Sequence, residues 1–364
     1  MHHKAQISLS IERAADDLRR GYPVILTTGH DDQARKYAIM PLELVNETSL
    51  NAFDTSFNNS FLLITDNRAA TIKVAHKGSE AVRLTRSKWL SSGDLIALAD
   101  PSADLSSPLK GPFSRLDSLD PDMDKAAIKL VKFARLLPAL LVAECLDTEV
   151  GFSITLNTYD ILNTDIGDSS KLMQVAAANI PLEGAAKTKF VAFRPVAGGL
   201  EHIAIIIGDF DRNSSVLMRI HSECFTGDLL GSLKCDCGDQ LKGAIKAIDQ
   251  AGGGIVLYLA QEGRGIGLIS KLKAYSLQDQ GYDTVDANTR LGFDVDERVY
   301  APAAEMLRAL HVKTVRLMTN NPNKIEALER FGIEVSERVA HKFPTNPHNH
   351  QYLEIKKSRT GHLL

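Results

Sequence analysis

The spacing of apolar positions divides the chain into alternating helices and strands. Residues 8–20 (SLSIERAADDLRR) place four apolar side chains on one face of an amphipathic helix, which Gly21 ends. A second helix is predicted at 124–137 (DKAAIKLVKFARLL) by the same period. Short apolar runs predict strands in this part of the chain at 23–26, 36–40, 60–65, 70–75 and 139–143.

The rest of the chain follows a similar alternation after a polar interval. Residues 146–172 are mixed and polar, and Gly167-Asp168-Ser169-Ser170 is their best turn signal, so they are predicted to be a linker. Beyond them the pattern predicts strands at 189–194, 202–207, 215–220, 255–260 and 314–318, helices at 239–250, 268–280 and 302–310, and a loop at 286–298. We therefore expect an α/β (α+β) fold in two domains, 1–145 and 173–364, joined by the linker 146–172.

Composition places the chain among ordinary globular proteins. A net charge of −3 argues against a general binder of nucleic acids or membrane surfaces. The longest apolar run, 136–143, is interrupted by Pro138 and is too short to cross a bilayer. The N-terminal residues lack the apolar core of a secretory signal, and the four cysteines do not form a disulfide framework. We expect a cytoplasmic protein.

Three of the four cysteines lie close together, in the spacing C-x10-C-x-C, at Cys224, Cys235 and Cys237. Thiolates gathered in a reducing compartment indicate a metal site, and three protein ligands with a fourth position left to water are typical of catalytic zinc. Such a metal acidifies its water near neutral pH. His221 and Glu223 could complete the metal shell or support it, and buried reduced cysteines are the alternative reading.

Two further stretches have the composition of phosphate-binding turns. QEGRGIGL (261–268) follows an apolar run, and its glycines allow close backbone approach while Arg264 supplies a fork of donors. TNNPNK (319–324) joins a strand to a helix, with a hydroxyl at Thr319 and a charge at Lys324. Each alone is equally compatible with tight packing or an ordinary capped helix.

Taken in order, a series of motifs from about Met173 to Leu364 resembles GTP cyclohydrolase II, the first committed enzyme of riboflavin synthesis. The motifs are HSECFTGDLLGSLKCDCGDQL, QEGRGIGL, AYSLQDQGYDT, NTRLGFDVDER, MTNNPNK and the terminal GHLL. The resemblance implies hydrolytic opening of the imidazole ring of GTP, with release of formate and pyrophosphate, by a homodimer that uses zinc and also magnesium on the triphosphate. The product would be 2,5-diamino-6-ribosylamino-4(3H)-pyrimidinone 5′-phosphate.

The resemblance also implies residue roles. The zinc ligands fall on Cys224, Cys235 and Cys237, the proton acceptor on Asp296 and an aid to ring opening on Tyr275. The family's proposed nucleophile toward the α-phosphate falls on Arg298; because a guanidinium stays protonated, stabilising charge on that phosphate is the plainer reading. The GTP contacts fall on Arg219, Ile220, His221, Ser222, Glu223, Gln240, Glu262, Gly263, Arg264, Thr284, Thr319 and Lys324.

The N-terminal part is similar to a different family. IERAADDLRRGYPVIL and AAIKLVKFARLLPALLVAE resemble the first and last parts of 3,4-dihydroxy-2-butanone 4-phosphate synthase, a magnesium enzyme. That family carries a dense acidic loop after its first strand, whereas this chain has TTGHDDQARKYAIM (27–40), in which Asp31 and Asp32 are followed by positive charge. We expect a degenerate domain with a structural or dimerising role and no synthase activity.

Two departures from the cyclohydrolase pattern leave other functions open. Ala260 stands where the family usually has arginine, which predicts lower turnover or weaker GTP binding, and Lys234 replaces the usual arginine before C-x-C. The alternatives are a non-catalytic GTP-binding regulator, a bifunctional enzyme that also makes 3,4-dihydroxy-2-butanone 4-phosphate, and a related enzyme of another pathway. A structural zinc module for nucleic acid fits poorly, because the spacing matches no common finger.

Overall fold

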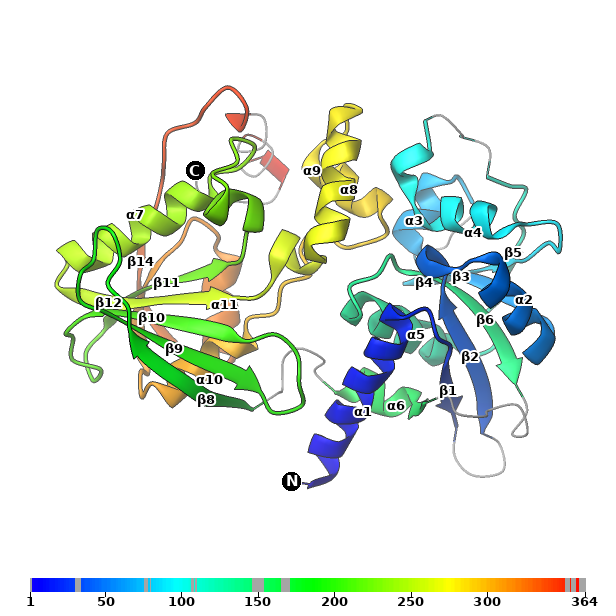
Figure 1. Cartoon of the computed structure of the whole chain (residues 1–364), viewed down its shortest axis with the longest axis horizontal. Helices are drawn as coiled ribbons and strands as arrows, with labels where there is room; N and C mark the ends of the chain where they lie inside the picture. Colours follow the sequence, from blue (N-terminus) through cyan, green and yellow to red (C-terminus); the bar gives the residue numbers. More distant parts are fainter. Residues whose placement is uncertain are drawn as a thin grey trace. The chain divides into compact units, whose positions relative to one another are not determined.

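The computed structural model describes residues 2–29, 34–74, 78, 80–105, 108, 110–145, 154–164, 171–350, 354 and 358–359. Contacts group the chain into two compact units (Figure 1). The first unit contains residues 1–166 and 269–297, and the second contains 167–268 and 298–364. Each is built on a seven-stranded sheet with helices, which confirms the α/β (α+β) class. The contiguous boundaries expected from the sequence stay a prediction, since contacts place 269–297 with the N-terminal half.

The first unit has a largely antiparallel sheet in the order β5-β4-β3-β6-β2-β1-β7. Only β1 and β7 pair in parallel among its described strands. Its strands are β1 (Val24–Thr28), β2 (Arg35–Pro41), β3 (Phe61–Thr65), β4 (Ala81–Thr85), β5 (Arg115–Leu116), β6 (Ala139–Cys145) and β7 (Thr155–Asn157). Its helices include α1 (His2–Arg19), α2 (Glu47–Ser56), α4 (Ser92–Ala99), α5 (Pro121–Phe133) and α6 (Thr158–Asn163).

Helices α1 and α5 close the main core of this sheet. Their apolar faces, including Ile11, Leu18 and Leu130, pack with Leu26 and Leu140 of the strands. Asp120 caps α5 by accepting the Met123 N–H, and a proline in the first turn favours the helix start. The helices predicted at 8–20 and 124–137 are therefore present with shifted ends.

Two predictions about this unit are wrong. The strand expected at 70–75 is not found in 70–74: α3 (Asp66–Thr71), which the Thr65 side chain caps, ends there in a turn, and residue 75 lies outside the described residues. The linker expected at 146–172 stays a prediction. Its described residues include β7, which joins the sheet beside β1, and α6, while 146–153 and 165–170, with the Gly167-Asp168-Ser169-Ser170 turn, lie outside the described residues. Part of the loop expected at 286–298 is α9 (Thr284–Arg290), which Asp283 caps.

The second unit has parallel strands at its centre, in the order β14-β13-β11-β12-β10-β9-β8. β11 pairs in parallel with β12 and β13, and β13 does so with β14. The strands are β8 (Leu172–Asn179), β9 (Thr188–Pro195), β10 (His202–Gly208), β11 (Val216–Ser222), β12 (Gly253–Leu259), β13 (Thr314–Met318) and β14 (Glu334–Val339). The helices are α7 (Cys237–Gln250), α10 (Ala301–Ala309) and α11 (Asn323–Arg330), while α8 (Gly267–Asp279) begins here and continues into the first unit.

Helices cover both faces of this sheet. Ala244 and Ile248 of α7 pack with Val256 in one core, and Met306 of α10 packs with Leu257 in the other. The carboxyl ends of β11, β12 and β13 lie at one edge, and β11 separates the other two. Open sheets of this kind bind ligands outside the carboxyl ends of their strands, where the connections leave in opposite directions.

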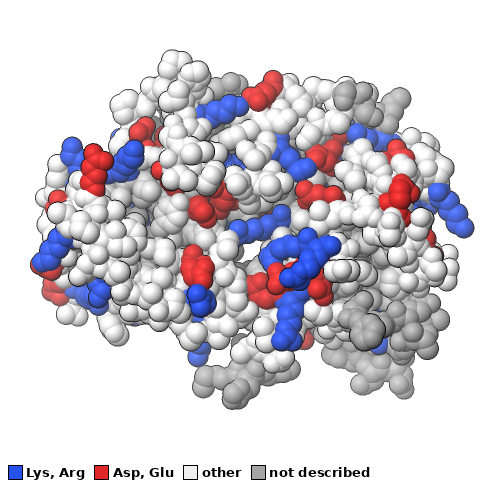
Figure 2. All heavy atoms as spheres, in the orientation of Figure 1, with Lys and Arg blue, Asp and Glu red and all other residues white. Residues whose placement is uncertain are grey.

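The surface drawn in Figure 2 carries charges of both signs. Basic and acidic side chains are interspersed over the face drawn in Figure 2, in keeping with the near-neutral composition. Among the described residues, no helix combines the length and the hydropathy needed to cross a bilayer.

Candidate metal centre and nucleotide site

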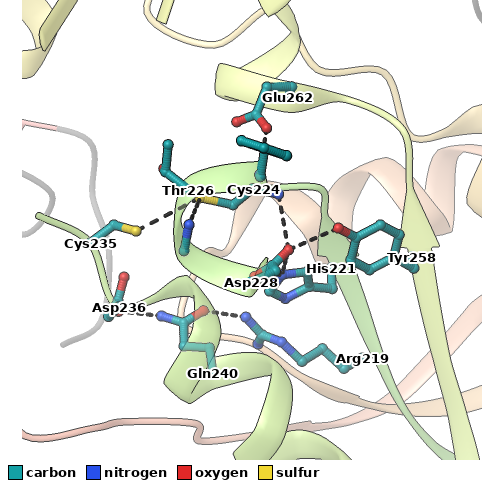
Figure 3. Close-up of polar contacts among 12 residues, drawn as sticks. Arg219, His221, Cys224, Thr226, Asp228, Cys235, Asp236, Gln240, Tyr258 and Glu262 are labelled. Atoms are coloured by element: carbon teal, nitrogen blue, oxygen red, sulfur yellow. Dashed lines mark hydrogen bonds and ion pairs between the residues drawn. The ribbon is translucent and has the colours of Figure 1, made fainter. Parts of the chain in front are cut away.

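The three predicted thiols meet beyond the carboxyl end of β11. Figure 3 shows two of them, Cys224 and Cys235. Cys224 follows β11, and Cys237 opens α7. Their sulfurs and that of Cys235 all lie within 4.8 Å of one another, with 3.7 Å between those of Cys224 and Cys235. Tetrahedral zinc with Zn–S bonds of about 2.3 Å separates its sulfur ligands by about 3.8 Å. All three cysteines are free, so the donor set fits zinc.

Glycine makes room for this cluster. The π-helix η5 (Phe225–Leu229) places Gly227 so that its N–H donates to the Cys224 sulfur at 3.3 Å. A Cβ on Gly227 would lie 2.8 Å from Cys235 Sγ, and one on Gly238 would lie 2.4 Å from the Gly227 carbonyl oxygen. We call residues 224–238 the cysteine turn; its backbone approaches the thiols more closely than a side chain allows.

The electrostatics of the thiols favour a bound cation. Hydrogen bonding with Cys224 is the main reason that the pKa of Cys235 rises to about 11, and the same thiol, with Cys235, raises the pKa of Cys237 well above its usual value. Three thiolates at this spacing repel one another. A divalent cation among them reverses that effect and holds the sulfurs deprotonated.

Asp228 ties the cysteine turn to the sheet, and sequence reasoning missed it. Its carboxylate accepts the Cys224 N–H at 2.9 Å, the Tyr258 hydroxyl at 3.0 Å and His221 Nε2–H at 3.0 Å (Figure 3). The His221 ring stacks on Tyr258, and burial lowers the pKa of His221. His221 is thus hydrogen-bonded to the cysteine turn, and its expected role in or around the metal shell stays a prediction.

Glu262 links the cysteine turn to the glycine-rich loop. It is 4% exposed, and its carboxylate accepts the Phe225 N–H at 2.6 Å and the Gly263 N–H at 3.1 Å. Gly263 and Arg264 both have left-handed backbones, with φ of 64° and 61°. A left-handed conformation is uncommon for arginine and marks a constrained loop. The backbone of Glu223 also joins this edge, donating to the Leu259 carbonyl.

Two buried cations lie beside the end of β11. Arg219 donates to the Met318 carbonyl at 3.3 Å and to the Gln240 side chain, and burial lowers its pKa to about 10, so it stays charged at neutral pH. Lys324 Nζ donates to the Ile220 carbonyl at 2.8 Å. Ser222 Oγ is buried and has no hydrogen-bond partner within the described parts of the chain. These groups create a positive, donor-rich edge suited to phosphates.

The remaining predicted residues occupy several places. Thr319 is buried after β13 and donates to the Asn321 carbonyl. Arg298 stands 5.8 Å from the Tyr300 ring in the second unit. Tyr275, Thr284 and Asp296 belong to the first unit, in α8, at the start of α9 and in the exposed turn after it. The terminal GHLL lies outside the described residues.

Comparisons with known proteins identify the family to which this chain is similar. The family model "GTP cyclohydrolase II" matches residues 173–340. The GTP cyclohydrolase-2 of Azospirillum brasilense is 44% identical to this chain, and the match covers 98% of this chain and 94% of that protein. The GTP cyclohydrolase-2 of Xylella fastidiosa (strain 9a5c) is 37% identical, and the match covers 98% of this chain and 88% of that protein. The solved structure of a two-domain 3,4-dihydroxy-2-butanone 4-phosphate synthase from A. baumannii matches at 15% identity and a TM-score of 0.34, over 91% of this chain and 99% of that one.

Proposed function

Because the chain belongs to the GTP cyclohydrolase II family, we propose that it opens the imidazole ring of GTP, releasing formate and pyrophosphate. The product is 2,5-diamino-6-ribosylamino-4(3H)-pyrimidinone 5′-phosphate, in the first step of riboflavin biosynthesis. The observation that carries the proposal is the thiol cluster at the carboxyl edge of β11, beside two buried cations. Cys224, Cys235 and Cys237 would hold the zinc ion, which would supply the acidity that activates water for hydrolysis at neutral pH.

The chain's own residues bind and orient the nucleotide. Arg219 and Lys324 set a positive potential that, with magnesium, offsets the triphosphate charge. The Ser222 hydroxyl and the backbone of the glycine-rich loop offer donors to the substrate. Asp296 accepts a proton, Tyr275 assists ring opening, and Arg298 stabilises charge on the α-phosphate.

The proposal also covers Ala260, which departs from the family pattern, and the compartment and oligomeric state of the enzyme. Ala260 is buried at the end of β12, and its N–H donates to His202 Nδ1 at 3.1 Å, so the loop is supported from β10. This contact does not replace the charge of the family's arginine, so we still expect lower turnover or weaker GTP binding. The enzyme acts in the cytoplasm as a homodimer with one zinc per chain, and its N-terminal half makes no dihydroxybutanone phosphate.

The test follows formate, pyrophosphate and the pyrimidine product together, from zinc-loaded protein with GTP and magnesium. Cys235→Ser should abolish all three products. Cys145→Ser, at a buried cysteine of β6 in the first unit, is the matched control and should retain them. GTP binding without formate would refute the proposal and favour the non-catalytic regulator. Turnover of ribulose 5-phosphate with magnesium would instead support the bifunctional alternative.

A further inference from the structure

The segment 269–297 carries three of the proposed functional residues but packs on the N-terminal half of the chain within the first unit. Helix α9 lies against α3. Asn67 of α3 donates to the Phe293 carbonyl at 3.0 Å, and the Phe293 side chain is 1% exposed. A Cβ on Gly292 would lie 2.9 Å from Pro138 Cγ, so the Gly292 backbone approaches the Pro138 ring closely. The start of the turn after α9 is therefore fixed by residues outside the cyclohydrolase motifs.

Lys132 of α5 fixes the other end of this turn. Its ammonium lies 2.8 Å from Asp294 Oδ2 and 2.7 Å from Glu297 Oε1. The Asp294 N–H donates to the same Glu297 oxygen at 2.8 Å, which closes the turn around Asp296. The lysine side chain is 19% exposed. Burial opposes its charge, but the two carboxylates outweigh burial and raise the pKa of Lys132.

We propose that Lys132 is a positioning residue for the cyclohydrolase reaction, through which the N-terminal half holds Asp296. This inference rests on the proposed function and gives the synthase-like half a task in it. Without the ammonium, Asp294 and Glu297 repel each other on either side of Asp296, and the turn opens. Catalytic groups displaced by about 1 Å lose about 100-fold in rate, so a support of this kind acts on turnover.

The same helix offers a matched control. Lys129 is one turn before Lys132, and its ammonium donates to the Leu162 and Thr164 carbonyls at 3.0 and 2.8 Å. Both lysines thus project from α5 to polar groups, and the two carbonyls that Lys129 contacts belong to the N-terminal half. Lys129→Met removes a comparable structural contact and leaves the turn intact.

The experiment compares full-length, zinc-loaded wild type with Lys132→Met, Lys132→Arg and Lys129→Met. We expect Lys132→Met to lower kcat for GTP by about 10- to 100-fold with little change in KM or zinc content. Lys132→Arg keeps the charge and should recover most of kcat, while Lys129→Met should stay within about threefold of wild type. Equal losses in Lys132→Met and Lys129→Met would overturn the inference, since they would indicate a general structural effect.

A second readout does not depend on activity. Hydrogen exchange of the amides in 293–298 should be faster in Lys132→Met than in wild type, and unchanged in Lys129→Met. A wild type that releases no formate would refute the proposed function, and the exchange data would still decide whether Lys132 holds the turn. Unchanged exchange in Lys132→Met would overturn the inference even in an active enzyme.

Discussion

The two units use sheets of equal strand number in opposite ways. In the first unit neighbouring strands run antiparallel except for β1 and β7, so successive carboxyl ends alternate between the edges. In the second, β11, β12 and β13 are parallel and end at one edge. Motifs that are distant in sequence therefore collect beside the thiols only in the second unit. In the first unit, the N-terminal half instead supports segment 269–297. The thiol cluster and the residues that support this segment therefore lie in different units.

The means of support differ as well. Asp228 and Glu262 hold the cysteine turn, and both lie in the second unit with it. Asn67 and Lys132 of the N-terminal half hold segment 269–297. Variants that loosen the cysteine turn should lose metal, whereas variants that loosen the segment should keep metal and lose turnover.

The largest effect is expected from Gly227→Ala. The added methyl carbon would lie 2.8 Å from Cys235 Sγ and 2.9 Å from Cys237 Cβ, so the sulfurs cannot keep their spacing. Zinc affinity should fall by at least about 100-fold, measured by competition with a chelator, and formate release should fall with it. Gly93→Ala is the control, because the atom nearest to its added methyl carbon would be the Ser91 hydroxyl oxygen, at an ordinary contact distance of 3.6 Å. A Gly227→Ala protein with full zinc affinity would show that the turn is not closely packed.

Asp228→Asn tests the link between the cysteine turn and the sheet. The amide keeps the shape but loses the charge that receives three donors. We expect zinc affinity or formate release to fall by about 10- to 100-fold, as for other groups that orient metal ligands. Asp239→Asn, an exposed acid in the first turn of α7, should change neither. Equal behaviour of the two variants would remove Asp228 from the site.

Sequence reasoning found the chemistry better than its support. Cys224, Cys235 and Cys237 were identifiable because cysteine is rare in this chain and their spacing is short. Asp228 lies inside the same motif, but an acid in a turn has no distinctive local signal, and its partner Tyr258 is 30 residues away. Lys132 belongs to an amphipathic helix, and its carboxylates lie more than 160 positions later.

The fold shows the same limit. The helices and buried strands that were predicted have strong apolar periodicity, although their ends shifted. Helices α2 and α4 and the largely buried strand β4 were not predicted. Strand β8 was missed because its residues are almost all exposed, which leaves no alternation to detect. Helix α3 was missed because one capping threonine, Thr65, outweighs a strand-like composition.

Acid should weaken the second unit through His341. Burial, with the charge of Arg219, lowers the pKa of His341 from 6.5 to about 4, and its Nε2–H donates to the Gln240 carbonyl at 2.8 Å. A lowered histidine pKa stabilises the fold above pH 6.5, and this stability is lost as pH falls toward 4. Between pH 7 and 5 the loss should be about 2 kcal/mol.

Denaturant unfolding of metal-loaded wild type and His341→Gln at the two pH values measures this contribution. The glutamine can keep the hydrogen bond but does not titrate, so its stability should change less with acid. Parallel curves for the two proteins would contradict the assignment. The exposed His311→Gln serves as the control for losing a histidine.

The smallest effect is expected at the far end of segment 269–297. Lys273 of α8 forms an ion pair with Asp100 and lies 3.7 Å from Glu43 Oε1, and its side chain is 22% exposed. Burial opposes the charge of Asp100, but Lys273 and Ser102 hold the pKa of that carboxyl below its usual value. Because partly exposed pairs contribute about 1 kcal/mol or less, Lys273→Met should lower kcat by about two- to fivefold and leave zinc unchanged. Lys246→Met, on the exposed face of α7, should match wild type. A loss as large as that of Lys132→Met would mean that the whole segment, and not the turn around Asp296, is what the N-terminal half positions.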